Sequence, residues 1–163
     1  MTFPRRATIL AAGALLAMSI AAGGAYGARA APPPQAARLN VGQFNYVLSC
    51  GGCHGLPGEA EKSGIPTLRG RAGAFLCSRE GREYVIRLPN VAFADMDDAS
   101  LAEVMNYVMF GLGRESIPAD AAPYSAAEVA GLRQAPLKNR DLLSMARELR
   151  AEAAMRCGAY PHG

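Results

Sequence analysis

Apolar residues recur at intervals of three and four along much of this chain, the spacing at which side chains share one face of an α-helix. The clearest example is a helix that begins at Asp97 or Asp98. Gly111 and Gly113 end it, because glycine is the commonest residue just beyond a helix. Its apolar stripe consists of Leu101, Val104, Met105, Val108 and Leu112. An earlier helix is predicted from about Asn40 into a cysteine-rich segment, with Val41, Phe44, Val47 and Leu48 at helical spacing.

Between these two helices the pattern is less regular. Residues 55–75 are rich in glycine and proline and are predicted to be loop. After them, Ser78 is a candidate cap for a helix over residues 79–88, which Pro89 stops. The alternating pattern typical of strands does not occur in the sequence, so the predicted fold class is all-α with loops.

The C-terminal part predicts two more helices. Ser125 and Glu128 have the spacing of a capping box, which starts a short helix that extends to about Gln134. Pro136 separates this helix from a longer one over about residues 140–156. Four apolar residues share a face of the longer helix: Leu142, Ala146, Leu149 and Ala153.

The N-terminus has the pattern of an export signal. Arg5 and Arg6 precede an uncharged run over residues 7–28, and an Ala-Arg-Ala cleavage pattern ends at residue 30. We therefore predict a cleaved signal peptide over residues 1–30, a proline-rich lead-in over 31–39 and a periplasmic location. The alternative is a retained membrane anchor, because the run is nearly long enough to span a bilayer.

Removal of that signal changes the charge of the protein. Three of the 17 basic residues and none of the 14 acidic residues fall in residues 1–30, which leaves 14 of each in the predicted mature chain. A balanced charge without a basic stripe gives no reason to expect a nucleic-acid partner.

The candidate chemistry is concentrated in Cys50-Gly51-Gly52-Cys53-His54. C-x-x-C-H is the signature of covalent c-type haem attachment. Two thiols on one helical turn can each form a thioether to a haem vinyl group, and the following histidine can ligate the iron. The alternatives are half of a zinc site or a thioredoxin-like redox pair. A zinc site would need two more ligands at a matching spacing, and the one other histidine is His162 near the end of the chain.

The two remaining cysteines, Cys77 and Cys157, are predicted to form a disulfide, because an even leftover pair in an oxidising compartment usually does. Closing so long a loop would stabilise the fold by about 3–5 kcal/mol in the chain-entropy description. The alternative is two buried free thiols.

In the order and spacing of its motifs the chain resembles a class I cytochrome c over residues 40–113. Gly42 and Tyr46 match a glycine and an aromatic residue of the family's first helix, and Tyr107 matches the aromatic residue of its last helix. Glycine permits close approach of the two helices, and the aromatic rings fill the crossing. The resemblance implies an all-α, cytochrome c-like fold wrapped around one covalent haem c, with residues 114–163 as a C-terminal helical extension.

The segment Ile65-Pro66-Thr67-Leu68 resembles the family's loop on the histidine side of the haem. There the proline carbonyl accepts a hydrogen bond from the ring N–H of the ligating histidine, which fixes its tautomer. The resemblance therefore implies that Pro66 and Leu68 belong to the cofactor site together with Cys50, Cys53 and His54. The alternative for Pro66 is a simple turn proline.

The resemblance departs from the family pattern at the sixth iron ligand, which is usually a methionine followed by proline before the last helix. Here that region reads Leu88-Pro89, and Met96 lies further along. Met96 is the candidate ligand, and the alternative is that it packs the start of the helix. Less favoured candidates are Met105, Met109, Met145, Met155 and His162. A five-coordinate or water-bound iron is also open.

These features predict a periplasmic single-haem protein that transfers electrons and is not itself an enzyme. Its expected partners are redox proteins: a periplasmic dehydrogenase, which the extension at 114–163 would serve, and a downstream electron acceptor. A membrane partner is expected only if the signal segment is retained. The alternative is a haem protein with an open distal side that binds a small ligand or has peroxidase-like activity. Arg87, which lies close in sequence to the region of the missing sixth ligand, is the basic residue considered for it.

Overall fold

The structure is a computed structural model that describes residues 40–60, 64–138 and 141–158. The predicted signal peptide (1–30), the lead-in (31–39) and the tail with His162 lie outside the described residues. All regular structure in the described part is helical, which confirms the predicted all-α class. None of the helices described there is long and apolar enough to span a membrane.

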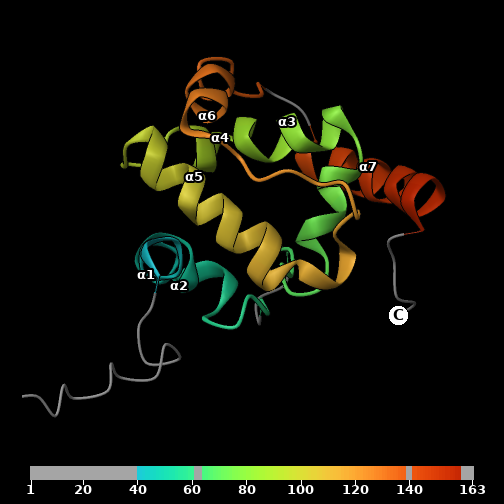
Figure 1. The fold of residues 1–163 in the computed structure, drawn as a ribbon, viewed down its shortest axis with the longest axis horizontal. Coiled ribbons are helices and arrows are strands. Elements are labelled where there is room, and N and C mark those ends of the chain that lie inside the picture. The colour runs from blue at the N-terminus through green and yellow to red at the C-terminus, as the bar shows by residue number, and fades with distance from the viewer. Residues whose placement is uncertain (1–39, 61–63, 139–140, 159–163) are drawn as a thin grey trace, which may run out of the picture. The chain divides into compact units, whose positions relative to one another are not determined.

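Ten helical elements follow one another along the described chain (Figure 1). They are α1 (Val41–Ser49), α2 (Gly51–His54), the 3₁₀ helix η2 (Ala72–Cys77), α3 (Arg79–Arg87), α4 (Pro89–Ala92), α5 (Asp98–Asn106), the π-helical turn η3 (Tyr107–Leu112), the 3₁₀ turn η4 (Arg114–Ser116), α6 (Ala126–Arg133) and α7 (Leu142–Cys157).

Side-chain caps start the longer helices, and the sequence predicts three of them: Ser78, Asp97 and Ser125. In each case a side-chain oxygen accepts a hydrogen bond from the backbone N–H three residues further on, which satisfies one of the free donors of the first turn. The caps are Asn40 on α1, Ser78 on α3, Asp97 on α5, Ser125 on α6 and Asp141 on α7. Local sequence therefore sets where these helices begin.

As predicted, α3 ends just before Pro89, which is also the first residue of α4, a position where its missing N–H costs nothing. Two local predictions are wrong in detail. The predicted loop at 55–75 ends earlier, because η2 begins at Ala72. The helix predicted up to Gly111 and Gly113 changes at Tyr107 into a π-helical turn that contains Gly111, and only Gly113 caps it.

α1 packs against α5 (Figure 1). A Cβ atom at Gly42 would collide with the backbone carbonyl of Glu103, so only glycine permits this approach. The rings of Tyr46 and Tyr107 fill the crossing with their centroids 5.4 Å apart and their planes tilted by 59°. The family resemblance predicted this glycine and both rings.

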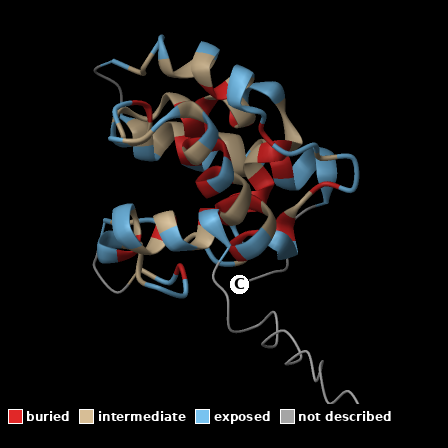
Figure 2. Cartoon of the chain, turned by 60° about the vertical axis from the view of Figure 1, so that its left-hand side comes forward, coloured by how far each residue is buried: buried red, intermediate tan, exposed pale blue. Residues whose placement is uncertain are grey.

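Burial is concentrated along α5 and η3 and on the faces of the helices around them (Figure 2). The whole predicted apolar stripe of this helix is buried: Leu101, Val104, Met105, Val108 and Leu112. Such a continuous stripe is what a helix must present when it packs on several partners. α5 contacts both α1 and α6.

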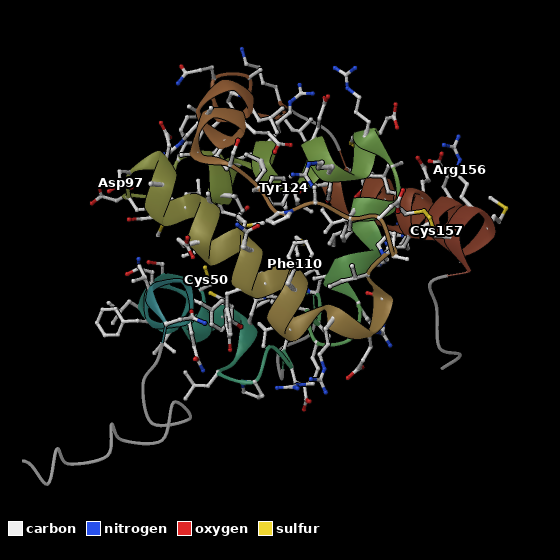
Figure 3. All side chains as sticks on the ribbon, in the orientation of Figure 1. Cys50, Asp97, Phe110, Tyr124, Arg156 and Cys157 are labelled. Carbon is white, nitrogen blue, oxygen red and sulfur yellow. A yellow bond between two sulfur atoms is a disulfide. The ribbon has the colours of Figure 1, made fainter. Side chains whose placement is uncertain are left out.

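Residues of the predicted extension belong to the same core. Tyr124 and Val129 are buried, and so are Ala146 and Ala153 on the predicted face of α7. The predicted disulfide is confirmed: Cys157 at the end of α7 is bonded to Cys77 at the end of η2, with Cα atoms 6.2 Å apart (Figure 3). The extension thus packs against the body through its interior as well as through a covalent bond.

Arg82 of α3 accounts for a further departure from the sequence prediction. Its guanidinium donates to both carboxylate oxygens of Glu128 and to the carbonyls of Ala122 and Pro123. The sequence predicts that Glu128 completes a capping box with Ser125. Only the serine half of that box forms, because the carboxylate pairs with Arg82 instead.

Candidate cofactor site

The cysteine–histidine motif forms a corner between α1 and α2. Cys50 follows the last residue of α1 and precedes the first residue of α2, and Figure 3 shows it at this position. Its carbonyl accepts hydrogen bonds from the backbone N–H groups of Cys53 (3.1 Å) and His54 (3.0 Å). One helical turn therefore carries both thiols and the imidazole. Cys50 is half-buried, Cys53 is exposed, and both are free thiols.

The imidazole of His54 is held from the opposite loop. Its Nδ1 lies 2.9 Å from the carbonyl oxygen of Pro66, twelve residues along the chain. A carbonyl can only accept, so Nδ1 carries the proton in this hydrogen bond and Nε2 keeps its lone pair. Among the described residues nothing hydrogen-bonds to Nε2. The ring is therefore oriented with one nitrogen available as a ligand.

A residue at the crossing of α1 and α5 holds the turn that follows His54. Gly55 has a φ of +74°, a conformation that favours glycine. The hydroxyl of Tyr46 donates a 2.7 Å hydrogen bond to the carbonyl of Gly55. Tyr46 thus joins the packing of α1 on α5 to the position of the histidine. Sequence analysis assigned its ring and missed its hydroxyl, since the acceptor is a backbone atom of a loop.

A second glycine ties together the two loops of the site. The carbonyl of Gly58 accepts hydrogen bonds from the N–H groups of Leu68 (2.8 Å) and Arg69 (3.1 Å). Gly58 has a φ of +77°, and a Cβ atom added to it would lie 2.9 Å from a methyl group of Leu112. Leu68 itself is half-buried against the core. The segment that carries Pro66 and Leu68 is thus anchored to the loop that follows the motif.

Burial favours the neutral form of two groups at this corner, Cys50 and Tyr46. It raises the pKa of the Cys50 thiol, and proximity to Cys53 raises it further. Burial, together with Cys50 and Tyr107, raises the pKa of Tyr46 to about 12. At neutral pH the corner therefore presents an uncharged thiol at Cys50, and Tyr46 keeps the proton that it donates to Gly55.

The structure places Met96, the candidate sixth ligand, on a different segment from the cysteine–histidine corner. Met96 is half-buried against the core, directly before Asp97, the cap of α5. That position is also typical of an apolar residue that packs the first turn of a helix. The packing interpretation of Met96 therefore fits its position, and ligation of the iron by Met96 stays a prediction.

The less favoured methionines lie elsewhere. Met105 and Met109 are buried in the core on α5 and η3. Met145 lines a groove between α3 and α7, and Met155 is 81% exposed on α7. None of these four positions carries a feature that marks it as a ligand.

Arg133 of α6 is a residue of this region that sequence analysis missed. It donates four hydrogen bonds to the segment around Met96. Three of the acceptors are backbone carbonyls, which leave no trace in the sequence, and all of them are more than thirty residues away. Only the fourth acceptor, Asp98, is a side chain of complementary charge.

The donor set fits haem attachment. In the described part of the chain, no group of three or more His, Cys, Asp or Glu side chains is arranged to hold a metal ion. The half zinc site considered from sequence therefore gains no further ligands there. Two free thiols and an imidazole with a fixed tautomer on one turn suit two thioether bonds and one axial ligand.

Comparison with known proteins points the same way. No protein-family model matches the chain. Two curated proteins named cytochrome c-552, both from Thermus thermophilus and one of them from a specified strain, are each 25% identical to it over 118 residues. The match covers 61% of this chain and 90% and 80% of those proteins. This distant similarity, together with the helical fold, suggests a c-type cytochrome, that is, a haem protein that transfers electrons.

Proposed function

We propose that this protein is a periplasmic electron carrier with a single haem c attached to Cys50 and Cys53. The observation that carries the proposal is the hydrogen bond between His54 Nδ1 and the carbonyl of Pro66, on the same turn as two free thiols. A histidine that follows a thioredoxin-like cysteine pair would have no need of such a bond. An axial histidine needs it, because the bond fixes the ring and strengthens the other nitrogen as a donor.

Each residue of the corner has a distinct role in this proposal. Cys50 and Cys53 would hold the cofactor by thioether bonds, and Nε2 of His54 would ligate the iron. Pro66 keeps the imidazole in the tautomer that leaves Nε2 available, and Leu68 would supply apolar surface to the cofactor. When bound, the haem supplies a one-electron couple between ferric and ferrous iron. The protein sets the potential of that couple through axial ligation, burial and hydrogen bonding.

Met96 is proposed as the sixth ligand. It stands directly before Asp97, the cap of α5, and its backbone carbonyl accepts a hydrogen bond from Arg133. A thioether ligand would raise the reduction potential of haem iron and would keep small molecules away from it. Both properties suit a carrier.

The alternative with an open distal side has less support. Its candidate basic residue, Arg87, donates to the carbonyl of Ala135 and lies 3.8 Å from Glu83. A peroxidase-like site needs a polar side chain that is free to act on a bound ligand. Arg87 is instead committed to joining α3 to the segment before α7.

We infer the location from the predicted export signal and from the disulfide. A disulfide between Cys77 and Cys157 is expected to persist in an oxidising compartment such as the periplasm. We propose that a periplasmic dehydrogenase reduces the protein and that a downstream acceptor reoxidises it. If so, dehydrogenases from the periplasm of the source organism should reduce it in the presence of their substrates and not without them. Failure with every such enzyme would exclude this class of partner.

The proposed cofactor is tested by producing the full chain together with haem-attachment machinery. Intact mass and the optical spectrum should show one covalent haem per chain that is reversibly oxidised and reduced. Attachment should be lost in a Cys50→Ala/Cys53→Ala variant. A Cys77→Ala/Cys157→Ala variant is the matched control, because it removes as many sulfur atoms outside the motif. Absence of covalent haem from the unmodified chain would falsify the proposed function.

A further inference from the structure

One guanidinium organises the segment that carries Met96. Arg133 lies near the end of α6, which packs beside α4 and α5 (Figure 1). Its Nε donates to the carbonyl of Ala92 (2.9 Å) and its Nη2 to that of Ala94 (2.7 Å). Its Nη1 donates to the carbonyl of Met96 (2.9 Å) and to the carboxylate of Asp98 (2.9 Å). Four acceptors spread over residues 92–98 thus converge on one side chain.

The arrangement leaves the segment little freedom. The Arg133 side chain is only 14% exposed, so its charge depends on these acceptors and on Asp98 in place of water. The three carbonyls belong to the end of α4 and its connection to α5. Between the two helices the backbone makes isolated turn hydrogen bonds, such as that from the Met96 N–H to the Ala94 carbonyl (2.9 Å). A planar fork of donors can hold several carbonyls at defined angles, which a lysine cannot do. The backbone of Met96 is therefore positioned by a residue of the C-terminal extension.

We propose that Arg133 is a positioning residue for the sixth coordination site of the iron. It holds the segment at residues 92–98 so that the thioether of Met96 stays on the metal. The inference rests on the proposed function and gives part of the extension a role in it. Through Arg133, α6 would influence the ligation of the iron, and hence the reduction potential, of a cofactor attached at Cys50 and Cys53. The extension at 114–163 then has a role besides covering the core.

Haem-loaded protein with Arg133→Met, which keeps a similar length and loses all the donors, tests the proposal. The sulfur-to-iron charge-transfer band of the oxidised protein should weaken or vanish. Carbon monoxide should bind to the reduced protein about tenfold faster or more, because one charge-assisted hydrogen bond contributes enough free energy for about a tenfold change in population. Arg133→Lys keeps the charge without the fork and should show the same changes to a smaller degree. If Arg133→Met does not fold, Arg133→Lys provides the test in its place.

Arg82→Met is the matched control. Arg82 is similarly shielded, at 19% exposed, and its four hydrogen bonds also tie the body to the extension, but none reaches residues 92–98. This variant should lose stability and keep the spectrum and carbon monoxide kinetics of the unmodified protein. An effect on the iron that followed from general loosening would appear in both variants and would overturn the proposal.

A Met96→Leu variant separates the possible failures. If the charge-transfer band survives in it, Met96 is not the ligand, and the inference fails while the electron-carrier proposal stands. If the band is lost there but unchanged in Arg133→Met, Met96 ligates without help from Arg133, and the inference again fails. If the unmodified chain carries no covalent haem, the proposed function itself fails. In a Met96→Leu background, Arg133→Met should add nothing to the carbon monoxide rate.

Discussion

Tyr46 connects packing to chemistry within a single side chain. Its ring packs against Tyr107 at the helix crossing, and its hydroxyl fixes the residue after His54. Because the ring is fully buried, ionisation of its hydroxyl inside the fold would leave a charge without water. The same burial that shapes the site therefore makes it sensitive to alkali.

This predicts a loss of stability at high pH. The ordinary pKa of tyrosine is about 10, whereas the pKa of Tyr46 is raised to about 12 and the pKa of Tyr124 is also raised by burial. Between about pH 10 and about pH 12 the folded state binds more protons than the unfolded state, so the free energy of unfolding falls as pH rises through this window. Urea unfolding measured across it should show the fall.

Tyr46→Phe is the control for that measurement. It should cost about 1 kcal/mol at neutral pH, because the hydrogen bond to Gly55 is lost, and it should flatten the alkaline decline. An unchanged slope in both Tyr46→Phe and Tyr124→Phe would show that neither hydroxyl is its cause.

At the scale of elements, the crossing of α1 and α5 depends on the absence of one methyl group. Gly42→Ala should destabilise the protein by about 1–3 kcal/mol, because the new Cβ meets the backbone carbonyl of Glu103, which cannot rotate away as a side chain could. Chemical denaturation measures the effect.

Gly131→Ala is the matched control for this substitution. Gly131 lies within α6 with nothing within 4 Å of the added Cβ, so alanine there should be neutral or stabilising by up to about 1 kcal/mol. Equal effects of the two substitutions would contradict the packing argument.

The elements also show which local structure can be read from sequence. Caps such as Ser78 and Asp97 act within three residues, so their side chains announce the helix start. The π-helical turn at 107–112 has no such local cause. There the N–H of Gly113 bonds to the carbonyl of Val108, and Gly113 lies in direct contact with the backbone of Gly73 on η2. Contact with a distant element decides how this helix ends.

For the molecule as a whole, the disulfide determines how firmly α7 is held. Removal of both cysteines with Cys77→Ala/Cys157→Ala should lower the free energy of unfolding by about 3–5 kcal/mol, because the bond closes a loop over a sequence separation of 80. Denaturant unfolding of the haem-loaded protein measures the loss. A reducing agent should lower the stability of the unmodified protein and leave that of the variant unchanged. Equal stability of the two proteins would show that noncovalent packing alone holds α7.

Short-range patterns in the sequence were enough to predict the helical class, most helix starts, the disulfide and the turn that carries Cys50, Cys53 and His54. The helices and the motif follow from the spacing of residues close together in sequence, and the disulfide follows from the number of cysteines. The helix crossing and the segment around Pro66 came from a family resemblance, which carries tertiary information that no single pattern holds.

Interactions whose acceptors are backbone carbonyls or shared partners became visible only in the folded chain. Glu128 pairs with Arg82 and does not cap its own helix, and the hydroxyl of Tyr46 donates to the carbonyl of Gly55. Arg133 donates to the carbonyls around Met96. Every residue has a carbonyl, so its presence in a sequence says nothing about which donor will reach it. That choice is made only when α6 packs against α4 and α5 and the buried guanidinium must find acceptors in place of water.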